Sequence, residues 1–197
     1  DRHTAPIDSP LRTDFQRDFD RIIFCSAFRR MQDKTQVFPL SKVDYIRTRL
    51  THSLEASSIG RSLGTLVGQA VIQRHTLNHI TAADIGNICA AACLAHDIGN
   101  PPFGHSGEES IRHWANTAPY GKNYVTQLAG SQRSDFLAFE GNAQGFRIVS
   151  TLQNPDNFGG LQLTCATLAA FSKYPRTSSP DGPIQWHQQQ KTWHQCG

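Results

Sequence analysis

Residues 96–105 read His-Asp-Ile-Gly-Asn-Pro-Pro-Phe-Gly-His, and residues 48–55 read Thr-Arg-Leu-Thr-His-Ser-Leu-Glu. The first stretch follows an apolar run that is typical of a buried helix. Its glycine and two prolines cannot continue that helix, so the helix is predicted to end near Asp97. The two stretches together supply His52, His96, Asp97 and a further His105. Such a set of side chains is typical of a metal-dependent site rather than of residues that build a core.

Two adjacent residues at a helix end can both reach one ion. Neighbouring helical side chains diverge by about 100°, and the turn after the helix leaves the Asp97 carboxylate free to swing inward. His52 adds a third ligand from another helix. A lone histidine is more often an ordinary polar residue, but a His-Asp pair beside Gly-Asn-Pro-Pro and a second histidine favours a ligand role. This mixture suits Mn, Fe, Co, Ni or Zn, and Mg where phosphate oxygens complete the shell; the metal would polarise a phosphate and acidify a bound water.

Length and composition set the broad class of protein. The chain has 197 residues with 38% hydrophobic and 18% charged residues, which is typical of one globular domain. A net charge of +3 permits phosphate-rich ligands without requiring them. Five cysteines without regular spacing favour a reducing, cytoplasmic setting. The sequence contains neither an apolar run long enough for a membrane span nor a signal-like amino terminus, so we expect no membrane association.

Hydrophobic periodicity predicts an all-α protein. Apolar residues recur at helical spacing, and Thr81 and Asp84 provide a helix start. Residues 116–135 are predicted to be a polar loop or excursion. The expected helices are Asp14–Met31, Arg47–Val71, one that is capped by Thr81 and is apolar over Ile85–Ala95, one from Ser106, Phe139–Leu152 and Leu161–Tyr174.

The last 22 residues, 176–197, differ in composition from the rest. They are rich in Ser, Pro and Gly and then in Gln, and they have no amphipathic period. Two interpretations stay open, a disordered tail and a shift of the reading frame in the gene. Sequencing the gene distinguishes them.

Several further motifs occur in a fixed order with the two stretches. They are Ser9-Pro10-Leu11-Arg12 with Phe15-x-Arg17-Asp18, residues 28–37, residues 95–108, Phe139-Glu140-Gly141-Asn142-Ala143-Gln144 and Leu168 to Pro175. In this ordered set the chain resembles the HD superfamily of phosphohydrolases, and more narrowly the deoxyguanosine triphosphate triphosphohydrolase (dGTPase) family. The resemblance implies an HD-domain helical bundle that is incomplete at the carboxyl end. It assigns residues 1–175 to the amino-terminal portion of that domain.

The resemblance also implies roles for particular residues. His52, His96 and Asp97 resemble three of the family's four metal ligands, and His105 with Glu108 resembles its catalytic histidine and the glutamate that orients it. Two further residues resemble substrate contacts, Arg49 to phosphate and Gln36 to the nucleoside.

Other side chains keep alternative interpretations. Glu108 could instead favour the helix dipole, as Glu109 could. Arg29, Arg30 and Lys34 are either phosphate ligands or solvated helix charges. Ser106 is not expected to be a nucleophile, because no activating residues accompany it.

The implied reaction is hydrolysis of dGTP or another dNTP to deoxynucleoside and inorganic triphosphate. Water would attack the α-phosphorus, and His105 would transfer a proton at the ester oxygen. The resemblance also implies a homo-oligomer and binding of single-stranded DNA.

One departure keeps a second function open. The family's fourth metal ligand is an Asp beyond the Lys173-Tyr174-Pro175 region, and none of Asp135, Asp156 and Asp181 has its surrounding motif. The alternative is therefore a catalytically incomplete fragment that binds nucleotide or single-stranded nucleic acid, using Arg29, Arg30, Lys34, Arg47 and Arg49. An HD-type phosphodiesterase acting on another phosphoester is the third interpretation.

Overall fold

The computed structural model describes residues 12–36 and 48–175 of the chain. These residues form helices and one isolated bridge between Thr35 and Thr48, so the all-α prediction is confirmed. Ser9 to Leu11, Arg47 and the tail 176–197 lie outside the described residues. The helices are α1 (Asp14–Phe24), α2 (Ser26–Arg29), η1 (Arg30–Asp33), α3 (Arg49–His75), α4 (Ala82–Ala95), α5 (His105–Thr117), α6 (Pro119–Thr126), α7 (Gly130–Leu137), α8 (Gly141–Arg147), η2 (Ile148–Leu152) and α9 (Cys165–Phe171).

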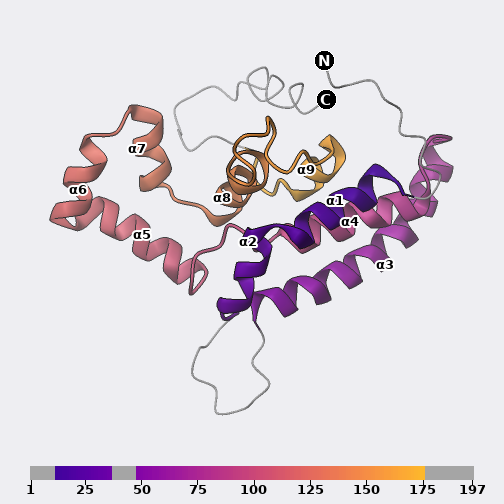
Figure 1. The fold of residues 1–197 in the computed structure, drawn as a ribbon, viewed down its shortest axis with the longest axis horizontal. Helices are drawn as coiled ribbons and strands as arrows, with labels where there is room; N and C mark the ends of the chain where they lie inside the picture. The colour runs from indigo at the N-terminus through magenta and orange to yellow at the C-terminus, as the bar shows by residue number, and fades with distance from the viewer. Residues whose placement is uncertain (1–11, 37–47, 176–197) are drawn as a thin grey trace, which may run out of the picture.

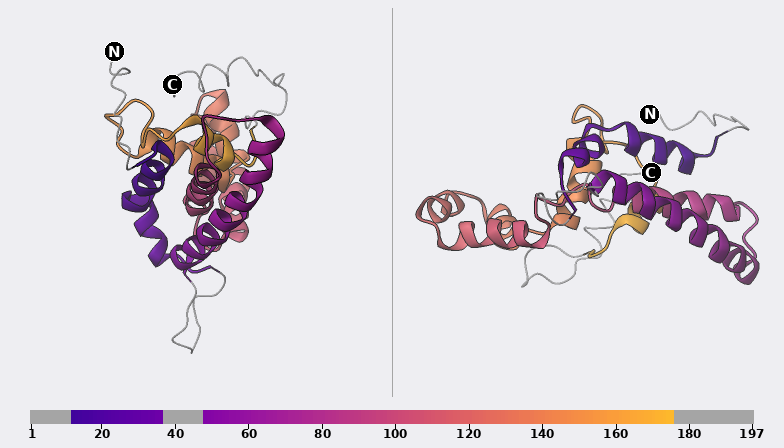
Figure 2. Two further views of the ribbon diagram at one scale, coloured as in Figure 1. Left: turned by 90° about the vertical axis from the view of Figure 1, so that its right-hand side faces the viewer. Right: turned by 90° about the horizontal axis from the view of Figure 1, so that it is seen from below.

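Helix α4 lies at the centre of the main body. The long helix α3 packs along it, and α1 and α9 also contact it (Figure 1). Helices α5, α6 and α7 pack on one another and project as an arm away from that body (Figure 2). The loop between α4 and α5 therefore joins the body to the arm.

The sequence of α4 explains its central place. Thr81 and Asp84 form a reciprocal capping box at its start, and the helix that follows is apolar nearly all round. Its Ala91 and Leu94 are completely buried in the core. Small residues let α3 approach closely, since a Cβ on Gly64 would lie 2.8 Å from the Cys89 sulfur. The central, buried helix predicted for Ile85–Ala95 is thus present.

A buried carboxylate ties α1 to α9. Asp18 is completely buried, and its Oδ2 accepts hydrogen bonds from the backbone N–H of Thr164 at 2.9 Å and from the Thr164 hydroxyl at 2.7 Å. The Thr164 hydroxyl in turn accepts from the Thr167 N–H and caps α9. Asp18 thus fixes the end of a helix 146 residues away along the chain.

The structure corrects several predicted element bounds. The helix expected over Asp14–Met31 breaks at Cys25, whose sulfur accepts a bond from the Phe28 N–H and starts α2. Residues 116–135 are mostly the helices α6 and α7, not a polar loop. The helix expected over Phe139–Leu152 begins at Gly141 and ends in a π-helical turn, and that over Leu161–Tyr174 is limited to Cys165–Phe171. Among the described helices, none combines the length and the apolar character that crossing a membrane requires.

Candidate metal centre

The ends of two packed helices carry the predicted ligands. The Thr48 side chain accepts a bond from the Thr51 N–H, so α3 starts at Arg49 and His52 lies within its first turns. Helix α4 ends at Ala95, His96 is its C-cap residue, and Asp97 follows. The predicted helix end is confirmed. It places a histidine and a carboxylate beside the start of α3.

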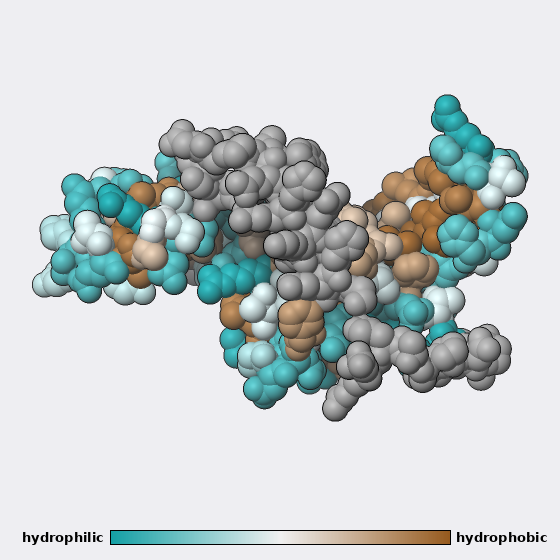
Figure 3. All heavy atoms as spheres, turned by 90° about the horizontal axis from the view of Figure 1, so that it is seen from above, coloured by the Kyte–Doolittle hydropathy of each residue, from teal (hydrophilic) through white to brown (hydrophobic). Residues whose placement is uncertain are grey.

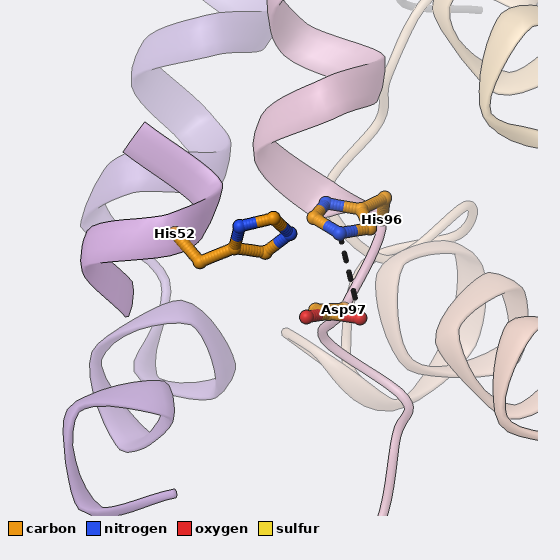
Figure 4. A group of neighbouring side chains, drawn as sticks. All are labelled: His52, His96 and Asp97. Atoms are coloured by element: carbon orange, nitrogen blue, oxygen red, sulfur yellow. Dashed lines mark ion pairs between the residues drawn. The ribbon is translucent and has the colours of Figure 1, made fainter. Parts of the chain in front are cut away.

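The three side chains meet, as the sequence predicts. Their potential ligand atoms all lie within 4.8 Å of one another. The His52 and His96 rings meet edge to face with centroids 5.2 Å apart, and His96 Nε2 lies 3.4 Å from Asp97 Oδ1 (Figure 4). Two imidazoles and one carboxylate form a donor set that first-row divalent ions accept, and Mg²⁺ tolerates such a set where phosphate oxygens complete its shell. The residues therefore fit a divalent metal ion.

The backbone of α4 fixes the tautomer of His96. Its Nδ1 lies 2.7 Å from the carbonyl oxygen of Cys93, an atom that can only accept a hydrogen bond. Nδ1 must therefore carry a proton, which leaves Nε2 as the ring nitrogen that can bind a metal ion. Metal-binding histidines commonly have such a partner on the other ring nitrogen. The Cys93 side chain itself packs toward α3, where a Cβ on Gly60 would lie 2.6 Å from its sulfur.

Asp97 is held on both carboxylate oxygens. Oδ2 accepts a bond from Arg49 Nη1 at 2.9 Å, and Oδ1 accepts one from Asn100 Nδ2 at 2.6 Å. Both Arg49 and Asp97 are buried, and the Arg49 Nε has no partner among the described atoms. Such bracing restrains a ligand carboxylate to one orientation. The Gly-Asn-Pro-Pro turn was predicted to end the preceding helix. Its Asn100 was not predicted as a site residue.

Lys34 supports the same loop from another side. Its Nζ donates to the Asn100 carbonyl oxygen at 2.9 Å. Burial lowers the pKa of Lys34, the nearby Arg49 lowers it further, and Asp97 acts in the opposite direction. Of the residues with two interpretations, Arg29 and Arg30 are exposed on the surface. Lys34, in contrast, lies against the candidate site.

The loop after Asp97 brings Arg49 close to the start of α5. Phe103 and Gly104 both have positive φ, 66° and 56°, and α5 begins at the next residue, His105. A Cβ on Gly104 would lie only 3.0 Å from Arg49 Nη2. Glycine thus lets the backbone turn sharply and pass close to the guanidinium. Through this contact the Arg49 side chain spans from Asp97 to the first turn of the arm.

His105 and Glu108 form a pair on α5. The His105 Nδ1 lies 3.3 Å from Glu108 Oε2. The imidazole is 93% exposed whereas the carboxylate is 5% exposed, so the pair presents one open face. The Glu108 Oε1 accepts a bond from the Gly141 N–H at 2.9 Å, which the sequence did not predict. One oxygen of the Glu108 carboxylate is thus fixed by the Gly141 N–H, and the other contacts the His105 ring.

Gln36 follows the short bridge between Thr35 and Thr48, which brings it next to the start of α3. Its side-chain Oε1 is buried and has no hydrogen-bond partner among the described atoms. A buried amide oxygen without a partner is costly, so such an atom commonly receives a donor from a ligand or water. This is compatible with the predicted contact to a nucleoside.

Comparison with known proteins identifies the domain. The HD domain profile matches residues 49–144, the range that carries His52, His96, Asp97, His105 and Glu108. Residues 49–144 of this chain are therefore an HD domain. Lys34 and Gln36 precede the matched range.

Relatives of this HD domain are similar over most of the chain. A deoxyguanosinetriphosphate triphosphohydrolase-like protein of Synechocystis is 59% identical over 168 residues, and one of Pseudomonas aeruginosa is 52% identical over 167. Each alignment covers 85% of this chain. A deoxyguanosinetriphosphate triphosphohydrolase of Cronobacter sakazakii is 38% identical over 198 residues. The chain spans only 37–38% of the length of these three relatives.

The HD domain also has a hollow that is separate from the candidate ligands. It has a volume of about 680 Å³, is lined by residues of α5 and its end that include Glu109, His113 and Trp114, and includes none of the predicted site residues. The hollow therefore adds no residue to the candidate metal centre. Glu109 and His113 are consequently suitable positions for control substitutions.

Proposed function

We propose that this HD domain hydrolyses a deoxynucleoside triphosphate, dGTP or another, to the deoxynucleoside and inorganic triphosphate. The observation that carries the proposal is the meeting of His52, His96 and Asp97 within 4.8 Å, with Arg49 on the same carboxylate. The HD domain supports a phosphohydrolase, and the names of the relatives supply the choice of substrate.

In this proposal His52, His96 and Asp97 hold a divalent ion, with Mg²⁺ or Mn²⁺ preferred and Co, Fe, Ni or Zn accepted by the same donors. A divalent ion at this position supplies Lewis-acid stabilisation of a phosphate and a more acidic water. Arg49 and Asn100 restrain the orientation of Asp97, since they donate to its two carboxylate oxygens.

His105 is proposed to move the proton. Glu108 engages its Nδ1, which leaves Nε2 of the exposed ring available to a substrate. Water adds to the α-phosphorus and releases a proton, the ester bond from phosphorus to the 5′ oxygen breaks, and a proton from His105 Nε2 ends on that oxygen. The proton that the water releases replaces the one that His105 has given up. Glu108 positions the ring and keeps the proton on Nδ1 throughout.

Charge and polarity around the group favour a phosphate-bearing substrate. Arg49 places a fixed positive charge between Asp97 and the start of α5, where it can neutralise charge that develops on the phosphate. Gln36 offers its unpartnered buried oxygen to a donor on the nucleoside. Lys34 adds a second cation beside the candidate ligands through its bond to the Asn100 carbonyl oxygen.

The relatives are much longer than this chain, so the structural support for the proposal comes only from the portion that the chain spans. The chain spans 38% of the Synechocystis relative, so activity of the whole protein is itself part of what we propose. Among the described residues, the group that meets this closely holds three ligands, and neither Asp135 nor Asp156 joins it. Three protein ligands can hold an ion with added waters, though more weakly than four.

The alternative, a fragment that only binds nucleotide or single-stranded DNA, needs open cationic side chains. Arg49, which that reading requires, is buried in an ion pair with Asp97. Arg47 lies outside the described residues. The binding-only alternative therefore loses one of its five named cations from the exposed surface.

Product analysis tests the proposal. The purified 197-residue chain is incubated with dGTP and Mn²⁺ or Mg²⁺, and the products are separated by anion exchange. We expect inorganic triphosphate from the native chain and from His113→Ala, and none from His96→Ala or Asp97→Ala. Absence of triphosphate from a folded native chain that binds dGTP would contradict activity of this chain alone. Turnover of a different phosphoester without triphosphate would favour a phosphodiesterase.

A further inference from the structure

Helix α3 has three flanks, and two of them are occupied. One flank carries Gly60, Gly64 and Gly68, where any added Cβ would meet residues of α4. A second flank carries Arg61, whose guanidinium lies 4.9 Å from the centre of the Phe19 ring of α1. The third flank faces none of the described helices, and its side chains show what it is suited to bind.

The third flank is an apolar stripe that we call the α3 seam. Ile59, Leu63, Leu66 and Ala70 recur at alternating steps of four and three residues. This is the spacing of the a and d positions in a helix that packs against another helix. Ile59, Leu63 and Leu66 are 62%, 57% and 67% exposed. Apolar residues gather on the end of the main body that carries α3 and α4 (Figure 3).

An exposed seam of this kind indicates a missing neighbour. Scattered exposed leucines are ordinary on a protein surface, but a continuous stripe at heptad spacing marks an interaction surface. Ser62 and Gln69, on the side of the seam away from α4, are uncharged and pose no electrostatic barrier to a second helix. The geometry therefore selects an amphipathic helix lying nearly parallel or antiparallel to α3.

The length of the relatives indicates where that helix comes from. This chain aligns with 38% of the Synechocystis relative, so the greater part of that polypeptide lies outside the aligned portion and can supply a neighbouring helix. The seam belongs to the same helix that carries Arg49 and His52. We propose that the α3 seam docks an amphipathic helix from the part of the family polypeptide that this chain does not span.

Co-expression tests this docking without nucleotide or metal. An affinity-tagged form of the 197-residue chain is produced together with the Synechocystis relative from which the aligned 168 residues have been removed. We expect the two polypeptides to co-purify in a 1:1 complex by size-exclusion chromatography with light scattering. Leu63→Glu with Leu66→Glu should reduce recovery of the partner by about tenfold or more, because two buried leucines are lost from the contact.

A pair of substitutions on another helix controls for charge. Ser131→Glu with Gln132→Glu adds the same two charges at exposed positions of α7 and should leave recovery unchanged. Circular dichroism checks that both variants keep the native helix content. Failure to co-purify, or equal loss in both pairs of variants, would overturn the proposal. So would a homodimer of the chain alone that Leu63→Glu dissociates, because the seam would then bind a second copy. Each outcome is independent of whether dGTP is hydrolysed.

Discussion

Gly141 donates its backbone N–H to Oε1 of Glu108 at 2.9 Å, which joins the start of α8 to the first turn of α5. The other oxygen of the same carboxylate meets His105 Nδ1. Any side chain at Gly141 would be excluded, since a Cβ there would lie 2.7 Å from Glu108 Oε1 and 2.2 Å from Asn100 Oδ1. The residue that orients the proposed catalytic histidine is thus itself oriented by backbone.

Glu108→Gln should abolish most of the proposed hydrolysis with little loss of stability. The amide can still accept from Gly141, but its NH2 group then faces His105 Nδ1 and reverses the tautomer that the carboxylate favours. We expect kcat to fall by about 100-fold or more, with KM nearly unchanged. Steady-state kinetics of dGTP hydrolysis measure this. Glu109→Gln, next in sequence and exposed, is the matched control and should retain native kcat.

Removing one imidazole should remove thermal stabilisation by metal. At a concentration 100 times the dissociation constant, Mn²⁺ should stabilise the native chain by about 2.7 kcal/mol and raise its Tm by about 5–10 °C. His96→Ala should lose this shift, because the remaining two ligands bind the ion far more weakly. Differential scanning calorimetry after chelation and metal addition measures it. An undiminished shift in His96→Ala, or its loss in the exposed His113→Ala, would contradict the assigned site.

Gly99→Ala should prevent normal packing of the loop after Asp97. A Cβ at Gly99 would lie 2.1 Å from both the Gly141 carbonyl oxygen and the Gly145 nitrogen, which are backbone atoms that cannot turn aside. We expect the free energy of unfolding to fall by about 3 kcal/mol or more. Urea denaturation followed by circular dichroism measures the loss. Gly130→Ala provides the comparison, because nothing lies within 4 Å of its added Cβ, and it should gain up to about 1 kcal/mol.

Asp18→Ala should destabilise the fold although Asp18 lies far from the site in sequence. The substitution leaves the Thr164 N–H and hydroxyl without their buried acceptor. The expected fall in the free energy of unfolding is about 3 kcal/mol. Asp14→Ala removes only an exposed ion pair with Arg17 on the same helix and should cost about 0.5 kcal/mol. Equal denaturation midpoints for the two variants would show that the link between α1 and α9 contributes nothing.

The features that the sequence predicted well rest on local chemistry. The end of α4 follows from Gly99, Pro101 and Pro102, and its start follows from Thr81 and Asp84. The helix end places His96 beside Asp97 whatever the rest of the chain does. The meeting of these two with His52 needed the packing of α3 on α4, which the family resemblance supplied.

The features that were missed depend on contacts between distant residues. The break after α1 is stabilised by Gln153, whose side chain accepts bonds from Ser26 and the Ala27 N–H. Helices α6 and α7 have weak amphipathic patterns, but Tyr124 packs between Trp114 of α5 and Phe136 of α7. No periodicity within one segment reports such pairings. For the same reason the sequence did not reveal Gly141 as the support for Glu108.

The unbroken length of α3 has a mechanical consequence. Its 27 residues form a rod of about 40 Å, with His52 near one end and Leu66 more than three turns further along. Because the helix is unbroken, a tilt of its distal half against α4 would displace the imidazole at the other end. A helix clamped against the seam would therefore act as an alignment device, setting how well the three ligand atoms converge without touching any of them.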